Sequence, residues 1–309
     1  MSPASRPPPP PPPAPPRHPV RTAVVPAAGL GTRLLPASLA VPKELLPLGR
    51  YPAIVHVLLE AVAARLEELV VVVSADKPGL RQLFEPAHWG AYAGHPATEP
   101  IHALLKMVHV RVVEQPQPWG VLDAIERGRL ALGPFPCAVL FPDLMHLPDQ
   151  RALPTLLAAH AACGGETIFG LYDAGATRAG THGPSAGVVL TLEEDSDTFS
   201  ERPLEHTVPR RIAELEAPEG SPERGALRTT FGYVHTAAYS EALAMVARPG
   251  PDEPLDDGRN LDALARLAEA GKLYGTFLPG EVVDLGVAPG YLDAVRRFAT
   301  GEAGWRDLP

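Results

Sequence analysis

Hydrophobic residues in the first half of the chain follow two alternating patterns. Short continuous apolar runs, such as the four consecutive valines at 70–73, are typical of strands buried on both faces of a parallel sheet. Segments with apolar residues at helical spacing separate these runs. We predict strands at 22–27, 67–74, 108–113, 137–141 and 167–172, and helices at 54–66, 121–132 and 153–162. This order predicts an α/β fold with a doubly wound, mixed but mainly parallel sheet.

The second half of the chain has shorter apolar runs separated by polar turns. It predicts strands at 187–192, 211–216, 231–236 and 280–284, and helices at 261–270 and 291–299. We therefore divide the domain at 20–309 into a first half, about 20–175, and a smaller, β-rich lobe, about 176–309. The last helix could belong to the core or contact a second copy, so the sequence leaves open whether the protein forms a homo-oligomer.

Composition narrows the class of protein. Proline dominates residues 1–19, and such a tract predicts a disordered, extended tail. Neither a secretory signal nor an apolar run long enough for a membrane span is present in the sequence. A formal net charge of -9 argues against binding to nucleic acid or to an anionic membrane. The cysteines, Cys137 and Cys163, have no paired spacing, so we expect free thiols in a soluble, cytoplasmic protein.

A glycine-containing turn directly follows the first predicted strand. Gly29 and Gly31 allow the backbone to approach a ligand and leave amide hydrogens free for phosphate oxygens. Arg33 can form forked hydrogen bonds with phosphate, and Lys43 supplies a second positive charge. A Gly-x-Gly turn alone fits an ordinary connection between a strand and a helix equally well. Its continuation into two cations makes it a candidate triphosphate site.

The whole string at 29–48, GLGTRLLPASLAVPKELLPL, resembles the signature of the sugar-phosphate nucleotidyltransferases. The likeness is greatest to the bacterial UTP–glucose-1-phosphate uridylyltransferases, with their AGLGTR and PKE-LPL blocks. This resemblance implies a Rossmann-like nucleotidyltransferase fold with the nucleotide in the first half and the sugar in the second. It also implies Arg33 and Lys43 as catalytic cations. The nucleotide-binding residues that it implies in this region are Ala28, Gly29, Gly31, Thr32 and Glu44.

A base-recognition loop is implied at 114–120. Gln115 can offer both a donor and an acceptor to the edge of uracil or thymine, and Gly120 would let its backbone lie against the ring. A surface loop with a single glutamine is the other interpretation. The family has Gly-Leu-Gly-His here, whereas this chain has Gly120-Val121-Leu122-Asp123 and keeps only the first glycine. The choice between UTP and dTTP therefore stays open.

Two aspartates follow predicted strands and are candidate metal ligands. A carboxylate at the carboxyl end of a buried parallel strand is well placed to hold Mg²⁺ against a triphosphate. Asp143 matches one metal-binding aspartate of the family, and Asp284, in Asp284-Leu285-Gly286, matches the second. Either residue alone could simply cap a turn. The two together predict a Mg²⁺ site.

The sugar side carries one clear departure from the family. Residues 185–189 resemble its Tyr-Gly-Val-Val strand and suggest Gly187 as a sugar contact, and Glu216 matches the glutamate of its Glu-Lys-Pro block. The lysine of that block, which holds the sugar phosphate, is replaced by Ala217. Its loss removes a charge-assisted contact worth roughly 1.5–3 kcal/mol. Arg178, Arg210, Arg211 and Lys272 could supply another cation.

The expected substrates are a nucleoside triphosphate and a sugar 1-phosphate. An ionised phosphate oxygen would attack the α-phosphorus and release pyrophosphate, so catalysis would come from alignment and charge neutralisation. One alternative is a weakened or inactive paralogue that binds sugar nucleotides in a regulatory role. Another is a scaffold protein that uses the proline tail for docking. That alternative predicts no convergence of the two cations and the two aspartates.

Overall fold

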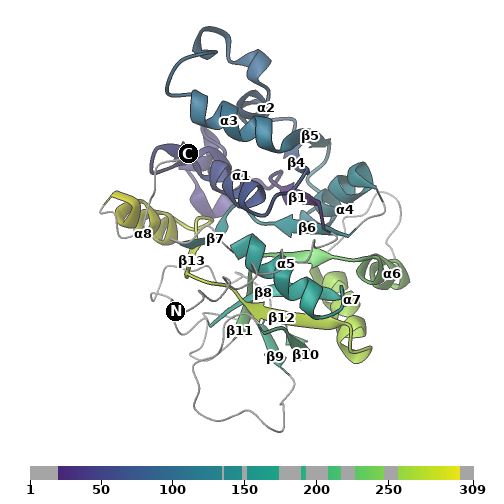
Figure 1. Ribbon diagram of the computed structural model, residues 1–309. Coiled ribbons are helices and arrows are strands. Elements are labelled where there is room, and N and C mark those ends of the chain that lie inside the picture. Colours follow the sequence, from purple (N-terminus) through teal and green to yellow (C-terminus); the bar gives the residue numbers. More distant parts are fainter. Residues whose placement is uncertain are drawn as a thin grey trace, which may run out of the picture.

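A computed structural model describes residues 20–133, 136–147, 152–173, 189–192, 208–216, 227–246 and 257–299. The proline-rich segment at 1–19 lies outside these described residues. A nine-stranded sheet runs through the molecule, with helices on both of its faces (Figure 1). Strands from both halves of the sequence belong to this one sheet.

The sheet is mixed and mainly parallel, as predicted. In spatial order its strands are β5 (His109–Gln115), β4 (Glu68–Ser74), β1 (Thr22–Pro26), β6 (Cys137–Leu140), β11 (Leu227–His235), β8 (Thr167–Asp173), β12 (Leu273–Phe277), β10 (Arg210–Glu216) and β9 (Val189–Leu192). The first four strands are parallel to one another. β11 is antiparallel to both β6 and β8, and β10 is antiparallel to both β12 and β9.

The valine run of β4 shows why helices cover both faces. Val71 and Val73 lie in one hydrophobic core. Val70 and Val72 lie in the other, because successive side chains of a strand point to opposite faces. The helices that supply the first core are α1 (Ala53–Ala63), α2 (Pro78–Phe84), α3 (Glu99–Met107) and α5 (Ala152–Ala162). Those of the second are α4 (Val121–Leu132), α6 (Ala237–Met245) and α7 (Asp257–Glu269).

A separate two-stranded sheet lies beside the large one. It pairs β7 (Leu144–Leu147) with β13 (Glu281–Asp284) in antiparallel register. The final helix, α8 (Ala288–Ala299), packs on β13 through a small apolar cluster (Figure 1). The short hairpin of β2 (Pro47–Leu48) and β3 (Tyr51–Pro52) contributes Leu48 to the same cluster. This arrangement connects the PKE-LPL block to α8.

Most predicted elements are confirmed, but several were missed. The helix predicted at 54–66 ends at Ala63, because the chain turns there and Arg65 adopts a positive φ of 58°. The helices and strands that the sequence patterns did not predict are α2, α3, α6, β2, β3, β7 and β12. Cys137 is buried, Cys163 is half-buried, and both are free thiols. None of the described helices is long and apolar enough to cross a membrane.

Candidate active site

A cavity of about 690 Å³ lies where loops leave the carboxyl ends of β1, β5 and β6. Eleven of the site residues predicted from the sequence line it. They are Ala28, Gly29, Gly31, Thr32, Arg33, Lys43, Glu44, Gln115, Gly120, Asp143 and Asp284. The carboxyl end of parallel strands is where α/β proteins bind ligands. The predicted glycine, PKE, glutamine and aspartate segments therefore meet in one place.

The glycine loop has a conformation that requires glycine at position 31. Gly31 has φ of +68°, and a Cβ there would lie 3.3 Å from the Cβ of Ser38. The Ser38 hydroxyl donates a hydrogen bond of 2.9 Å to the carbonyl oxygen of Gly31. A single 3-10 turn, Thr32–Leu34, follows and presents Arg33 to the cavity. The loop is thus held by a side chain of the segment that follows it.

A buried lysine that the sequence patterns did not single out fixes the same loop. The ammonium group of Lys77 donates to the carbonyl oxygens of Ala27, at 2.8 Å, and Gly29, at 2.6 Å. The two following peptide bonds are trans, so the N–H groups of Ala28 and Leu30 point away from Lys77. Ala28 and Leu30 line the cavity, and Lys77 does not. These two amides are therefore oriented toward the cavity side.

The Glu44 carboxylate pairs with the buried ammonium group of Lys77. Its side chain is 1% exposed and accepts hydrogen bonds from Lys77 at 3.0 and 3.2 Å. Burial raises the pKa of the Glu44 carboxyl, against the opposing effects of Lys77 and Lys43. Glu44 therefore neutralises the buried ammonium that holds the glycine loop. Nothing about Lys77 in the sequence signals this contact, since it follows β4 outside any motif.

The two aspartates and two cations converge around Gly286. A Cβ at Gly286 would lie 3.0 Å from Oδ1 of Asp284, 3.1 Å from Oδ2 of Asp143 and 3.0 Å from Nη2 of Arg33. The ammonium group of Lys43 donates to Oδ2 of Asp143. Burial alone would raise the pKa of the Asp143 carboxyl, but Lys43 and then Arg33 outweigh it and hold that pKa below its ordinary value. The scaffold hypothesis predicted no such convergence.

The small sheet explains how residues so far apart in the chain meet. Asp284 pairs in register with Leu144, the neighbour of Asp143. The amide of Leu285 donates to the carbonyl oxygen of Asp143 at 2.7 Å, and the amide of Gly286 donates to Oδ1 of Asp284 at 2.8 Å. Because β7 was not predicted, the sequence alone could not supply this pairing.

Asp143 and Asp284 supply the kind of ligand that a magnesium ion needs. One oxygen of each carboxylate lies about 3 Å from the position that a Cβ of Gly286 would occupy, and Mg²⁺ prefers oxygen ligands. Among the described residues no cluster of three or more His, Cys, Asp or Glu side chains could enclose a metal. Mg²⁺ commonly uses one or two protein carboxylates and takes its other ligands from substrate phosphates and water. The donor set therefore matches a site that the substrates complete.

The predicted base-recognition residues, Gln115 and Gly120, contact each other in the structure. Gln115, at the end of β5, is buried, and its amide nitrogen donates to Gly120 and to Asp123, a residue not predicted for the site. Thr229 and Thr230 of β11 also line the cavity.

The predicted sugar side lies only partly within the described residues. Glu216 ends β10, but its side chain lies outside them. Gly187, Arg178 and Ala217 lie outside the described residues. The other three candidate cations, Arg210, Arg211 and Lys272, are not among the cavity-lining residues.

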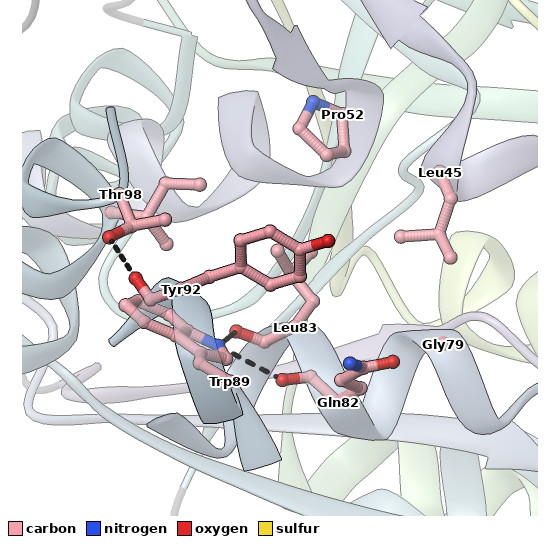
Figure 2. A pocket seen from close by; sticks show the side chains of 9 residues that line it. Leu45, Pro52, Gly79, Gln82, Leu83, Trp89, Tyr92 and Thr98 are labelled. Carbon is pink, nitrogen blue, oxygen red and sulfur yellow. Dashed lines mark hydrogen bonds between the residues drawn. The ribbon is translucent and has the colours of Figure 1, made fainter. Parts of the chain in front are cut away.

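A second cavity, of about 340 Å³, has a different character (Figure 2). Its wall includes Leu45, Trp89 and Tyr92, and none of its lining residues carries a charge. The Trp89 ring nitrogen donates to the carbonyl oxygens of Gln82 and Leu83, so it caps the end of α2 (Figure 2). Without a cation among its lining residues, this cavity is poorly suited to phosphate. The larger cavity is therefore the candidate active site.

Comparison with known proteins assigns the chain to a family. The sequence matches the family model described as nucleotidyl transferase over residues 22–300. UTP–glucose-1-phosphate uridylyltransferase 2 of Staphylococcus saprophyticus is 25% identical over 298 residues, which cover 93% of this chain and 95% of that protein. UTP–glucose-1-phosphate uridylyltransferase of Mycoplasma pneumoniae is 37% identical over 147 residues, which cover 46% of this chain and 50% of that protein.

The fold is also shared with solved structures. A UDP-glucose pyrophosphorylase complexed with UDP-glucose has a TM-score of 0.71 at 22% identity, covering 91% of this chain and 99% of that one. A UTP-bound UGPase from Acinetobacter baumannii also has a TM-score of 0.71 at 22% identity, covering 94% and 95%. Both likenesses show a common fold and confirm the predicted architecture. The match over residues 22–300 shows more, and the chain belongs to the nucleotidyl transferase family.

Proposed function

We propose that the chain transfers a uridylyl group from UTP to glucose 1-phosphate and releases pyrophosphate. The observation that carries this proposal is the meeting of Arg33 and Lys43 with the Asp143 and Asp284 carboxylates in one cavity. Relatives named as UTP–glucose-1-phosphate uridylyltransferases support the choice of substrates. The product of the reaction is UDP-glucose.

The proposed reaction is a substitution at phosphorus that needs no general base. An ionised oxygen of the sugar phosphate forms a bond to the α-phosphorus, and the bond from that phosphorus to the pyrophosphate oxygen breaks. No proton moves in this exchange, so alignment and charge neutralisation carry the rate enhancement. The amides of Ala28 and Leu30 would bind phosphate oxygens. Arg33 and Lys43 would stabilise the departing pyrophosphate.

We propose Asp143 and Asp284 as the residues that hold Mg²⁺. When bound, Mg²⁺ would neutralise negative charge on the phosphates. Lys43 keeps Asp143 ionised, which a metal ligand requires. Gln115 and Gly120 would contact the base, and Gly187 and Glu216 the sugar. In this proposal the segment at about 20–175 binds the nucleotide and the one at about 176–309 binds the sugar.

A second candidate function rests on one substitution. Ala217 replaces the lysine that the resemblance assigns to the sugar phosphate. A protein that kept the nucleotide cavity and lost turnover would bind sugar nucleotides in a regulatory role. The two functions differ in whether pyrophosphate is formed.

The test is pyrophosphate release with Mg²⁺, with UTP or dTTP offered against glucose 1-phosphate. We expect release that requires both substrates and disappears in Asp143→Ala. Glu67→Ala is the matched control, because it removes an exposed carboxylate that pairs with Arg21 at the surface. No release despite measurable UTP binding would favour the regulatory function. Absence of both binding and release would reject the proposal.

Two broader expectations remain predictions. The free thiols of Cys137 and Cys163 support a reducing, cytoplasmic location. A homo-oligomer is likewise a prediction, to be tested by light scattering of the purified protein.

A further inference from the structure

The side chain of Gln115 is locked by neighbours that only accept hydrogen bonds. It is 4% exposed, and its amide nitrogen lies 3.0 Å from the carbonyl oxygen of Gly120 and 2.7 Å from Oδ2 of Asp123. A carbonyl oxygen and a carboxylate have no hydrogen to donate. The NH₂ group of Gln115 must therefore face both of them, and both of its hydrogens are used.

The carbonyl oxygen of Gln115 is what remains for a ligand. It accepts no hydrogen bond from any described residue, and it is not among the buried polar atoms that lack a partner. Gln115 lines the 690 Å³ cavity beside Gly120 and Val121. The side chain thus offers the cavity an acceptor and no donor.

A second contact holds Asp123 in place. Nε of Arg127, one turn along α4, donates to the same Oδ2 atom at 2.6 Å. The Arg127 guanidinium lies 5.5 Å from the ring centre of Trp119, which is part of the loop before α4. In the family stretch that the sequence resembles, this position belongs to the histidine of Gly-Leu-Gly-His, and here it is Asp123. Arg127 thus holds the carboxylate that orients Gln115.

We propose that this chain selects its base by one fixed acceptor, and that Asp123 is the positioning residue that sets it. The inference rests on the proposed nucleotidyl transfer. Uracil and thymine carry an N–H at ring position 3 that can donate to the Gln115 oxygen. Cytosine has a lone pair at that position, so two acceptors would face each other. A site built around a hydrogen bond rejects a partner that cannot form it by at least about a hundredfold.

The experiment compares kcat/KM for UTP, dTTP and CTP in wild type and Asp123→Ala. Without the carboxylate, the Gln115 amide can turn and offer its NH₂ group to cytosine. We expect the UTP-to-CTP ratio to fall at least about tenfold. The values for UTP and dTTP should fall in equal proportion, because both rings present the same N–H.

Two further variants separate positioning from general damage. Glu126→Ala removes a carboxylate from the same helix that pairs with Arg129 outside the cavity, and it should leave the UTP-to-CTP ratio unchanged. Asp123→Asn keeps an acceptor for Gln115 and should retain most of the preference. If Asp123→Ala does not fold, Arg127→Ala should also lower the ratio, since it frees the carboxylate to turn.

Calorimetric titration with UTP and CTP in Mg²⁺ distinguishes failure of the inference from failure of the proposed function. A binding preference for UTP that Asp123→Ala removes supports the inference even if no pyrophosphate is released. Turnover of UTP with an unchanged ratio in Asp123→Ala overturns the inference and leaves the proposed function standing. Equal binding of UTP and CTP by the wild type also overturns it.

Discussion

The ammonium nitrogen of Lys77 lies 2.6 Å from the carbonyl oxygen of Gly29, across 48 residues of sequence. A side chain that follows β4 thereby fixes the backbone of the loop that follows β1. The contact turns carbonyl oxygens away from the cavity and amide hydrogens toward it. Preorganised donors of this kind stabilise phosphate without reorganisation when the ligand binds.

Replacing this lysine should affect stability and nucleotide binding separately. Lys77→Met leaves Glu44 buried without its cation, which costs about 3–5 kcal/mol in the free energy of unfolding. Adding Glu44→Gln should recover part of that loss, because the buried charge is gone. The KM for UTP should stay raised in both variants, while the KM for glucose 1-phosphate changes little. Urea unfolding and initial rates measure the two effects, and recovery of the UTP KM in the double variant would contradict this assignment.

The pair of Lys43 and Asp143 predicts a stability difference that depends on pH. The pKa of Asp143 lies below its ordinary value, because Lys43 and Arg33 outweigh the effect of burial. A carboxyl of this kind stabilises the fold above its unfolded pKa, and the contribution is lost as pH falls through the folded one. Lys43→Met should lower the free energy of unfolding by about 3 kcal/mol at neutral pH.

That difference should shrink as pH falls, first as the buried Asp143 carboxyl of the folded variant takes up a proton and finally as that of the folded wild type does. Urea unfolding of both proteins between pH 7 and pH 3 measures this difference in the free energy of unfolding. Lys106→Met is the matched control, since Lys106 forms only an exposed pair with Glu99 and should change little at any pH. A difference that stays constant with pH would exclude Asp143 as the group responsible.

Gly286→Ala should damage the proposed metal site more than the fold. The new methyl group would lie 3.0 Å from Oδ1 of Asp284 and 3.1 Å from Oδ2 of Asp143, so the carboxylates must move apart. Overpacking of this kind costs about 1–3 kcal/mol of stability. We expect a rise of at least about tenfold in the Mg²⁺ concentration needed for half-maximal rate. Titration of the rate with Mg²⁺ checks it, and an unchanged requirement would argue against Asp143 and Asp284 as the metal ligands.

Trp89→Phe tests whether the apolar cavity takes part in catalysis. The variant keeps most of the packing but loses the two hydrogen bonds to the end of α2. We expect a loss of about 1 kcal/mol in the free energy of unfolding. The kcat/KM for UTP should stay unchanged, because none of the residues lining this cavity is charged. A selective fall in kcat/KM without a change in stability would instead connect the cavity to the active site.

The sequence by itself determined the class of fold and many of the residues that line the candidate active site. Buried apolar runs and helical spacing are local signals, so β4 and α4 could be predicted from their own residues. The glycine loop, the PKE block and both aspartates carry recognisable chemistry within a few neighbouring positions. The approach of the glycine loop, Gln115 and Asp143 to one cavity followed from the rule that parallel strands present their carboxyl ends at one edge of a sheet. Asp284 ends a strand of the separate antiparallel pair, so its approach did not follow from that rule.

Only the tertiary structure decided which side chains support these groups. Lys77 lies outside the motifs and Asp123 departs from one, and their roles depend on where their atoms lie relative to Gly29 and Gln115. Hydrogen bonds form between atoms within about 3 Å, and a sequence does not contain that distance. β7 was missed for the same reason, because its partner β13 lies more than a hundred residues away in the chain. Local patterns predict helices, strands and candidate site residues, whereas long-range packing decides how each of those residues is held in place.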